Sequence, residues 1–80
     1  MLKNLRKMKD IKAQIKEFGN HVDCRYVDNG FYEIRMHDIS AKYFVSRYFD
    51  CIELKSMCDY VLEFELIGMQ NKLIGAGLWV

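Results

Sequence analysis

Residues 22–36 carry the sequence VDCRYVDNGFYEIRM, in which two strand-favouring runs flank the turn residues Asp28-Asn29-Gly30. Such a turn between such runs is a strong signal for a β-hairpin. A two-residue Asn-Gly turn would mix polar and apolar side chains on both faces. A three-residue loop, with Gly30 in the left-handed conformation, makes one face apolar and gives the other face complementary charges, which specifies register. We therefore predict the three-residue loop.

The predicted hairpin has one apolar and one charged face. The apolar pairs are Val22 with Met36, Cys24 with Ile34 and Tyr26 with Tyr32, and the charged pairs are Arg25 with Glu33 and Asp23 with Arg35. The same register sets His21 opposite His37. Two such imidazoles could chelate a metal or exchange a proton in phosphodiester cleavage. Since a structural zinc site normally has four ligands, we expect neither a metal nor a cofactor. A small His-dependent nuclease is one functional alternative, ranked after a protein-binding and an RNA-binding function.

An amphipathic helix is predicted over residues 2–18. Its apolar residues recur at steps of three or four and share one face, namely Leu5, Met8, Ile11, Ile15 and Phe18. Gly19 is suited to the C-terminal cap. The polar side carries a stripe of Lys9, Lys12 and Lys16, with Lys3 and Lys7 on another flank.

The aromatic segment 41–49 predicts a third strand. Its expected core side consists of Ala41, Tyr43, Val45 and Phe49, and its other face carries Lys42, Phe44, Ser46 and Tyr48. Asp50 and Glu53 resemble a capping box, which indicates a helix start. A second helix through about Leu66 would bury Leu54, Met57, Cys58, Val61 and Leu62.

The C-terminal part of the chain allows more than one secondary structure. Gly68 is expected to end the second helix, although the alternation of Leu62, Phe64 and Leu66 leaves a strand open over residues 61–67. Residues 73–80 carry no charge. An exposed apolar strand edge would aggregate, so we expect an interior strand there or one that a partner covers. The resulting fold is a single α+β domain over residues 1–80, with an N-terminal helix, a three-stranded antiparallel meander, a second helix and a short C-terminal strand.

The composition excludes several classes of protein. With 51% hydrophobic residues, the 80-residue chain is too apolar to be disordered. The longest apolar run, residues 73–80, is too short to span a bilayer, and no signal-peptide core follows the first residues. The three cysteines cannot all pair within the chain and none is in a C-x-x-C motif, so we expect reduced thiols and a cytoplasmic location.

Charge is distributed unevenly along the chain. Residues 1–17 carry six basic and two acidic side chains, whereas the other residues carry six basic and nine acidic ones. A basic segment on an acidic body can steer an anionic partner toward the chain. It can equally be the solvated side of an ordinary helix.

The predicted partner-binding residues combine cations with aromatics, namely Lys9, Lys12, Lys16, Lys42, Phe44, Arg47, Tyr48 and Trp79. In a protein complex the lysines would set the association rate, while Phe44, Tyr48 and Trp79 would be buried anchors. Phe44 and Tyr48, flanked by Lys42 and Arg47, could instead stack single-stranded RNA. No serine elbow, HExxH motif or paired catalytic carboxylates are visible, so we expect a non-enzymatic binding protein, with an RNA-binding regulator as the alternative. A homodimer is the alternative to a compact monomer.

The chain resembles the small early accessory proteins of T4-like bacteriophages. The Lys-rich opening (Lys3 to Lys16), the Asp28-Asn29-Gly30 hairpin, the aromatic segment into Asp50-Cys51-Ile52-Glu53 and the absence of proline carry this resemblance. It implies an inhibitor that acts in the host cytoplasm and neutralises a host protein such as a toxin or a defence enzyme. No functional residue is transferred from the family, because no motif matches position by position.

Overall fold

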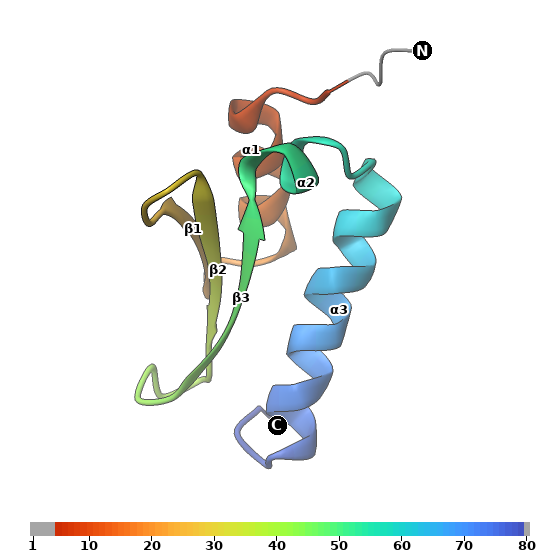
Figure 1. Cartoon of the computed structure of the whole chain (residues 1–80). Coiled ribbons are helices and arrows are strands. Elements are labelled where there is room, and N and C mark those ends of the chain that lie inside the picture. The colour runs from red at the N-terminus through yellow and green to blue at the C-terminus, as the bar shows by residue number, and fades with distance from the viewer. Residues whose placement is uncertain (1–4, 80) are drawn as a thin grey trace.

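The computed structural model describes residues 5–79, so positions 2–4 of the expected first helix and Val80 lie outside the described residues. The elements are α1 (Met8–Phe18), β1 (Val22–Tyr26), β2 (Phe31–His37), β3 (Phe44–Asp50), α2 (Cys51–Lys55) and α3 (Asp59–Gly75). The strands form one antiparallel sheet in the order β1-β2-β3, with α1 and α3 beside it (Figure 1). The predicted α+β class, with its N-terminal helix and three-stranded meander, is confirmed.

The predicted hairpin register is also confirmed, with Tyr26 opposite Tyr32 and Val22 opposite Met36. Both Asn29 (φ 51°) and Gly30 (φ 80°) adopt the left-handed conformation, and the Phe31 N–H donates to the Asp28 carbonyl at 2.9 Å. Two positive φ angles at the centre of a turn match the twist of hairpin strands. Asp28 is the additional residue that shifts the register from that of a simple two-residue turn.

The apolar face of the sheet forms the core together with the helices. Its buried members are Ile11, Ile15, Val22, Ile34, Met36, Phe49, Leu54, Leu62, Leu66, Met69 and Leu73. They come from every helix and strand, so the core joins α1 and α3 through one face of the sheet. The other face of the sheet carries none of these core residues.

The first helix begins at Met8, so residues 5–7 of the predicted helix are not helical. The preceding segment is held by α2 instead, because the Arg6 N–H donates to the Lys55 carbonyl at 2.8 Å and the Arg6 guanidinium donates to the Met57 carbonyl at 3.4 Å. Leu5 is 46% exposed, so its expected place in the core is wrong. The predicted burial of Ile11 and Ile15 is confirmed.

The third strand begins at Phe44, three residues later than expected. A turn occupies the preceding positions, because the Asp38 carboxylate accepts hydrogen bonds from the Ser40 hydroxyl (2.6 Å) and the Tyr43 N–H (3.0 Å). Ala41 adopts a left-handed conformation (φ 60°) in this turn. Ala41 and Tyr43 are therefore exposed and not in the core, whereas Phe49 is buried as predicted.

The expected second helix is divided into α2 and α3. Asp50 caps α2 as predicted, since its side chain accepts the Glu53 N–H at 2.7 Å. The chain then leaves the helix at Ser56–Cys58 and re-enters it at Asp59, so residues 61–67 are helical and Gly68 lies inside α3. Leu54 and Leu62 are buried as expected and Met57 is partly buried, whereas the predicted burial of Cys58 and Val61 is wrong.

The expected C-terminal strand is absent from residues 73–79. The helix continues to Gly75 and ends in a cap in which Gly77 has a φ of 74° and the Leu78 N–H donates to the Leu73 carbonyl at 3.0 Å. This is the hydrogen-bond pattern of a Schellman cap. The uncharged tail avoids an open strand edge because Leu73 joins the core, and Leu78 and Trp79 fold back against it.

Candidate functional site

The face of the sheet opposite the core is the candidate binding surface, and we call it the outer sheet face. The register places on it the side chains of Asp23, Arg25, Phe31, Glu33, Arg35, His37, Phe44, Ser46, Tyr48 and Asp50. The core helices pack on the opposite side, as Figure 1 shows, and no helix of residues 5–79 covers this face. The exposed side chains of this face, which include Arg25, Phe44 and Tyr48, are therefore available to a partner.

Glu33 forms the centre of the outer sheet face. Only 1% of it is exposed, because Arg25 (2.9 Å), Arg35 (3.1 Å) and the Tyr48 hydroxyl (3.1 Å) all donate hydrogen bonds to its carboxylate. Burial acts to raise the pKa of Glu33, but these three donors outweigh it and the pKa is lowered from its ordinary value. The anchored carboxylate thus fixes two arginines and one tyrosine in position.

Aromatic side chains stand beside this network. Phe44 is 48% exposed and Tyr48 is 57% exposed, and both come from β3. The Arg35 guanidinium lies 4.0 Å from the centre of the Phe44 ring, and the His37 ring meets the same phenyl group edge-on at 5.9 Å. Cation–π contacts of this kind hold an aromatic ring in one orientation.

A shallow depression of about 470 Å³ lies among the polar residues of the outer sheet face. Its lining includes Asp23, Arg25, Glu33, Arg35 and His37. Within residues 5–79, Arg35 Nε and His37 Nδ1 are buried and have no hydrogen-bond partner. A group from a partner molecule that enters the depression could satisfy these nitrogens.

The predicted lysine stripe lies on exposed positions of α1 and borders the β1 side of the sheet. Lys16 Nζ contacts the Asp23 carboxylate at 2.8 Å, and Lys12 Nζ lies 5.9 Å from the centre of the Tyr32 ring. The Lys16–Asp23 pair is exposed on both sides, so it adds little stability. Because Lys9, Lys12 and Lys16 are all exposed, their charges can attract an anionic surface at long range.

The structure brings together some predicted site residues and separates others. Phe44 and Tyr48 share one face as predicted, but Arg47 projects from the opposite face, where it bonds Glu65 of α3 at 2.9 Å. Lys42 lies in the turn before β3. The cations beside the aromatics are instead Arg25 and Arg35, which were not among the predicted site residues. Their place on the charged hairpin face was the signal that could have identified them.

The structure places Trp79 beside His21 and away from His37. The Trp79 ring is partly buried and stacks on the His21 ring at 4.4 Å, and His21 Nε2 contacts Gln70 Oε1 at 2.7 Å. The backbones of His21 and His37 are paired, with the His37 N–H donating at 2.9 Å, yet the His37 ring contacts Phe44. The described residues contain no group of three or more His, Cys, Asp or Glu side chains that could hold a metal.

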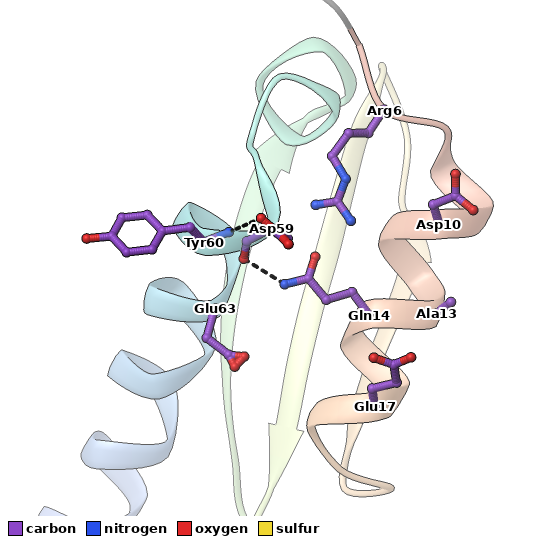
Figure 2. Close-up of a pocket in the computed structure, with 8 residues that line it drawn as sticks. All are labelled: Arg6, Asp10, Ala13, Gln14, Glu17, Asp59, Tyr60 and Glu63. Atoms are coloured by element: carbon purple, nitrogen blue, oxygen red, sulfur yellow. Dashed lines mark hydrogen bonds between the residues drawn. The ribbon is translucent and has the colours of Figure 1, made fainter.

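A second surface is the groove between α1 and α3, with a volume of about 610 Å³ (Figure 2). Its lining carries four carboxylates, from Asp10, Glu17, Asp59 and Glu63, and the guanidinium of Arg6. Gln14 reaches across from α1 and donates to the Asp59 carbonyl at 2.7 Å, while the Tyr60 ring points away from α1 (Figure 2). The acidic lining makes this side of the molecule unsuited to nucleic acid.

No protein-family model, curated protein or solved structure matches the chain. In the described part of the chain, every helix is too short or too polar to cross a membrane. Function is therefore inferred from the geometry, burial and charge of the surfaces.

The three cysteines are free and differ in environment, which gives a testable order of reactivity. Burial raises the pKa of the Cys24 thiol to about 11, although the nearby Lys12 charge opposes this shift. Cys58 is exposed. Because the thiolate is the reactive form, we expect iodoacetamide at neutral pH to alkylate Cys58 at least ~10 times faster than Cys24. Peptide mass spectrometry over a time course measures both rates, and equal rates would contradict the burial of Cys24.

Proposed function

We propose that this chain is a non-enzymatic binding protein that inhibits a partner protein by covering part of its surface with the outer sheet face. The observation that carries the proposal is the exposure of Phe44 and Tyr48 beside arginines that Glu33 holds in place. Aromatic residues and arginine are enriched among residues that dominate binding energy. Side chains that are already ordered lose less entropy on binding, which favours affinity.

The proposed partner is a host protein in the cytoplasm of a bacterial cell, such as a toxin or a defence enzyme. The resemblance to early accessory proteins of T4-like bacteriophages supports this class of target. The exposed stripe of Lys9, Lys12 and Lys16 supports an acidic patch on the target, which the stripe would attract before contact. A second copy of the chain is a further proposed partner, for which α3 has a separate surface.

RNA binding by the same face is the alternative, and one observation favours it. Phe44 and Tyr48 are exposed on one sheet face, and Arg35 lies against the Phe44 ring, as in a stacking platform for bases. However, three carboxylates, from Asp23, Glu33 and Asp50, lie on the same face as Arg25 and Arg35, so the face has no excess of positive charge to hold phosphates. The balance of charge favours a protein partner.

The test is affinity capture from a bacterial lysate with the tagged chain. A Phe44→Ser/Tyr48→Ser double variant removes both aromatic anchors, and Tyr43→Ser is the matched control because Tyr43 is also 57% exposed but lies in the turn before β3. Each hot-spot residue contributes about 2 kcal/mol or more to binding. We therefore expect the double variant to lose a specific captured protein at least ~100-fold, whereas the control retains it.

Nuclease treatment and a direct binding assay distinguish the two functions. Capture that survives nuclease and depends on Phe44 and Tyr48 supports a protein partner. Captured material that absorbs at 260 nm and that nuclease removes would indicate bound RNA. If a labelled single-stranded RNA also binds the chain in a fluorescence anisotropy assay, the chain is an RNA-binding regulator. Equal capture by the wild type and the double variant would exclude the outer sheet face as the site.

A further inference from the structure

Helix α3 is apolar on two opposite faces. One face enters the core through the fully buried Leu62, Leu66, Met69 and Leu73. The other face carries Tyr60, Phe64, Ile67 and Ile74, which we call the α3 stripe. These residues are 66%, 58%, 41% and 50% exposed. Steps of four, three and seven residues place them on one side of a helix, with the polar Asn71 between Ile67 and Ile74. An ordinary surface helix would be polar at most of these positions.

The packing of the chain itself does not account for the α3 stripe. Within residues 5–79 the only aromatic partner of Tyr60 is Phe64, whose ring it meets edge-on at 4.9 Å. Gly68 lies in the middle of the helix and is exposed, and a methyl group added there would contact nothing within 4 Å. Glycine inside a helix costs about 1 kcal/mol relative to alanine. The monomer thus has no packing reason for this glycine, which would permit close approach of another helix.

We propose that a second copy of the chain packs on the α3 stripe, with the two α3 helices antiparallel about a twofold axis near Ile67 and Gly68. The N-terminal half of the stripe carries the large rings of Tyr60 and Phe64, and the C-terminal half carries Ile74. An antiparallel arrangement places the bulky half of each helix against the slimmer half of the other. A twofold axis uses the same patch on both copies, which is the usual form of a homodimer.

The exposed area is sufficient for a weak, specific dimer. The four residues of the α3 stripe, with the 40%-exposed Val61 beside them, offer roughly 500 Å² per copy. A total of about 1,000 Å² is at the lower limit for specific interfaces. We therefore expect a dissociation constant in the micromolar range, so dimers form at high protein concentration and dissociate on dilution.

Sedimentation equilibrium over about 1 to 200 µM tests this proposal. The wild type is expected to change from monomer to dimer mass over this range. Phe64→Glu is expected to remain monomeric, because its dissociation constant for the dimer should be at least ~30-fold higher. Ile52→Glu is the matched control, because Ile52 is 63% exposed but belongs to α2, and it should behave as the wild type. If Phe64→Glu does not fold, Ile74→Glu replaces it, since Ile74 is also half exposed.

A wild type that is monomeric at 200 µM, or a Phe64→Glu variant that dimerises as the wild type does, would overturn the proposal. The variants leave the outer sheet face unchanged, so failure of the dimer and failure of lysate capture are distinguishable.

Discussion

Leu66→Ala is expected to lower the free energy of unfolding by about 2–5 kcal/mol, because Leu66 is fully buried between α3 and the sheet. Phe64→Ala, two residues earlier, is expected to change it by less than about 1 kcal/mol, since the exposed Phe64 ring contacts mainly Tyr60. For a domain of this size, the first change corresponds to a decrease in Tm of roughly 10–30 °C. Urea and thermal denaturation monitored by circular dichroism measure both effects.

The comparison also distinguishes the helix from the strand that the sequence left open over residues 61–67. A strand would place Leu62, Phe64 and Leu66 on one buried face, so the two alanine variants would lose similar stability. In α3, Leu62 and Leu66 are buried whereas Phe64 is exposed. Measurements at protein concentrations below about 1 µM avoid any contribution from self-association. Equal destabilisation by the two variants would contradict the helix.

Glu33→Gln is the second change with a large expected effect, a loss of about 1–3 kcal/mol at neutral pH. The amide keeps the shape of the side chain but removes the charge that pairs with Arg25 and Arg35. Glu63→Gln is the matched control, because Glu63 is an exposed carboxylate on α3 and should change stability little. Denaturation of the three proteins in urea at pH 7 gives the comparison.

The effect of Glu33 also depends on pH in a defined direction. Its pKa is lower in the folded chain than its ordinary value, so its contribution is fully present above about pH 5 and is lost as the pH falls through the folded pKa. Asp38, whose pKa is lowered by the Ser40 hydroxyl and the Tyr43 N–H against the effect of burial, loses its contribution in the same direction. The difference between wild type and Glu33→Gln should therefore shrink as the pH falls below about 4.5. A difference that stays constant would show that the charge of Glu33 is not what stabilises the sheet.

The hairpin shows what the sequence can predict. Alternating polar and apolar residues on both sides of Asp28-Asn29-Gly30 admit one register that separates the two faces, and the structure has that register. The steps of three and four in α1 likewise identify Ile11 and Ile15 as buried. In these segments one face is buried and the other is exposed, so the apolar period is unambiguous.

Helix α3 shows why the rest could not be predicted. Because it carries Leu62 and Leu66 on one face and Phe64 and Ile67 on the other, its apolar residues show no single helical period. Gly68 was expected to end the helix, since a glycine within a helix is unfavourable. A helix with two apolar faces therefore looks irregular in sequence.

The outer sheet face was predicted only in part, because its composition depends on where β3 begins. The turn held by Asp38 delays the strand to Phe44, and no pattern in residues 38–43 indicated that delay. Phe44 and Tyr48 still share one face, as expected, since residues four apart in a strand point to the same side. Arg47 lies on the other face, because neighbouring residues in a strand point to opposite sides. The cations beside the two aromatic rings are Arg25 and Arg35 instead of Arg47.

Site-specific photo-crosslinking tests the proposed binding surface most directly. A photoreactive phenylalanine analogue introduced at position 48 lies on the outer sheet face, and the same analogue at position 43, which is equally exposed, lies outside it. Irradiation of bacterial cells that contain either variant is expected to yield one discrete protein adduct from position 48 and none from position 43. Equal adducts from both positions, or adducts from position 43 alone, would contradict the assignment of the outer sheet face as the binding surface.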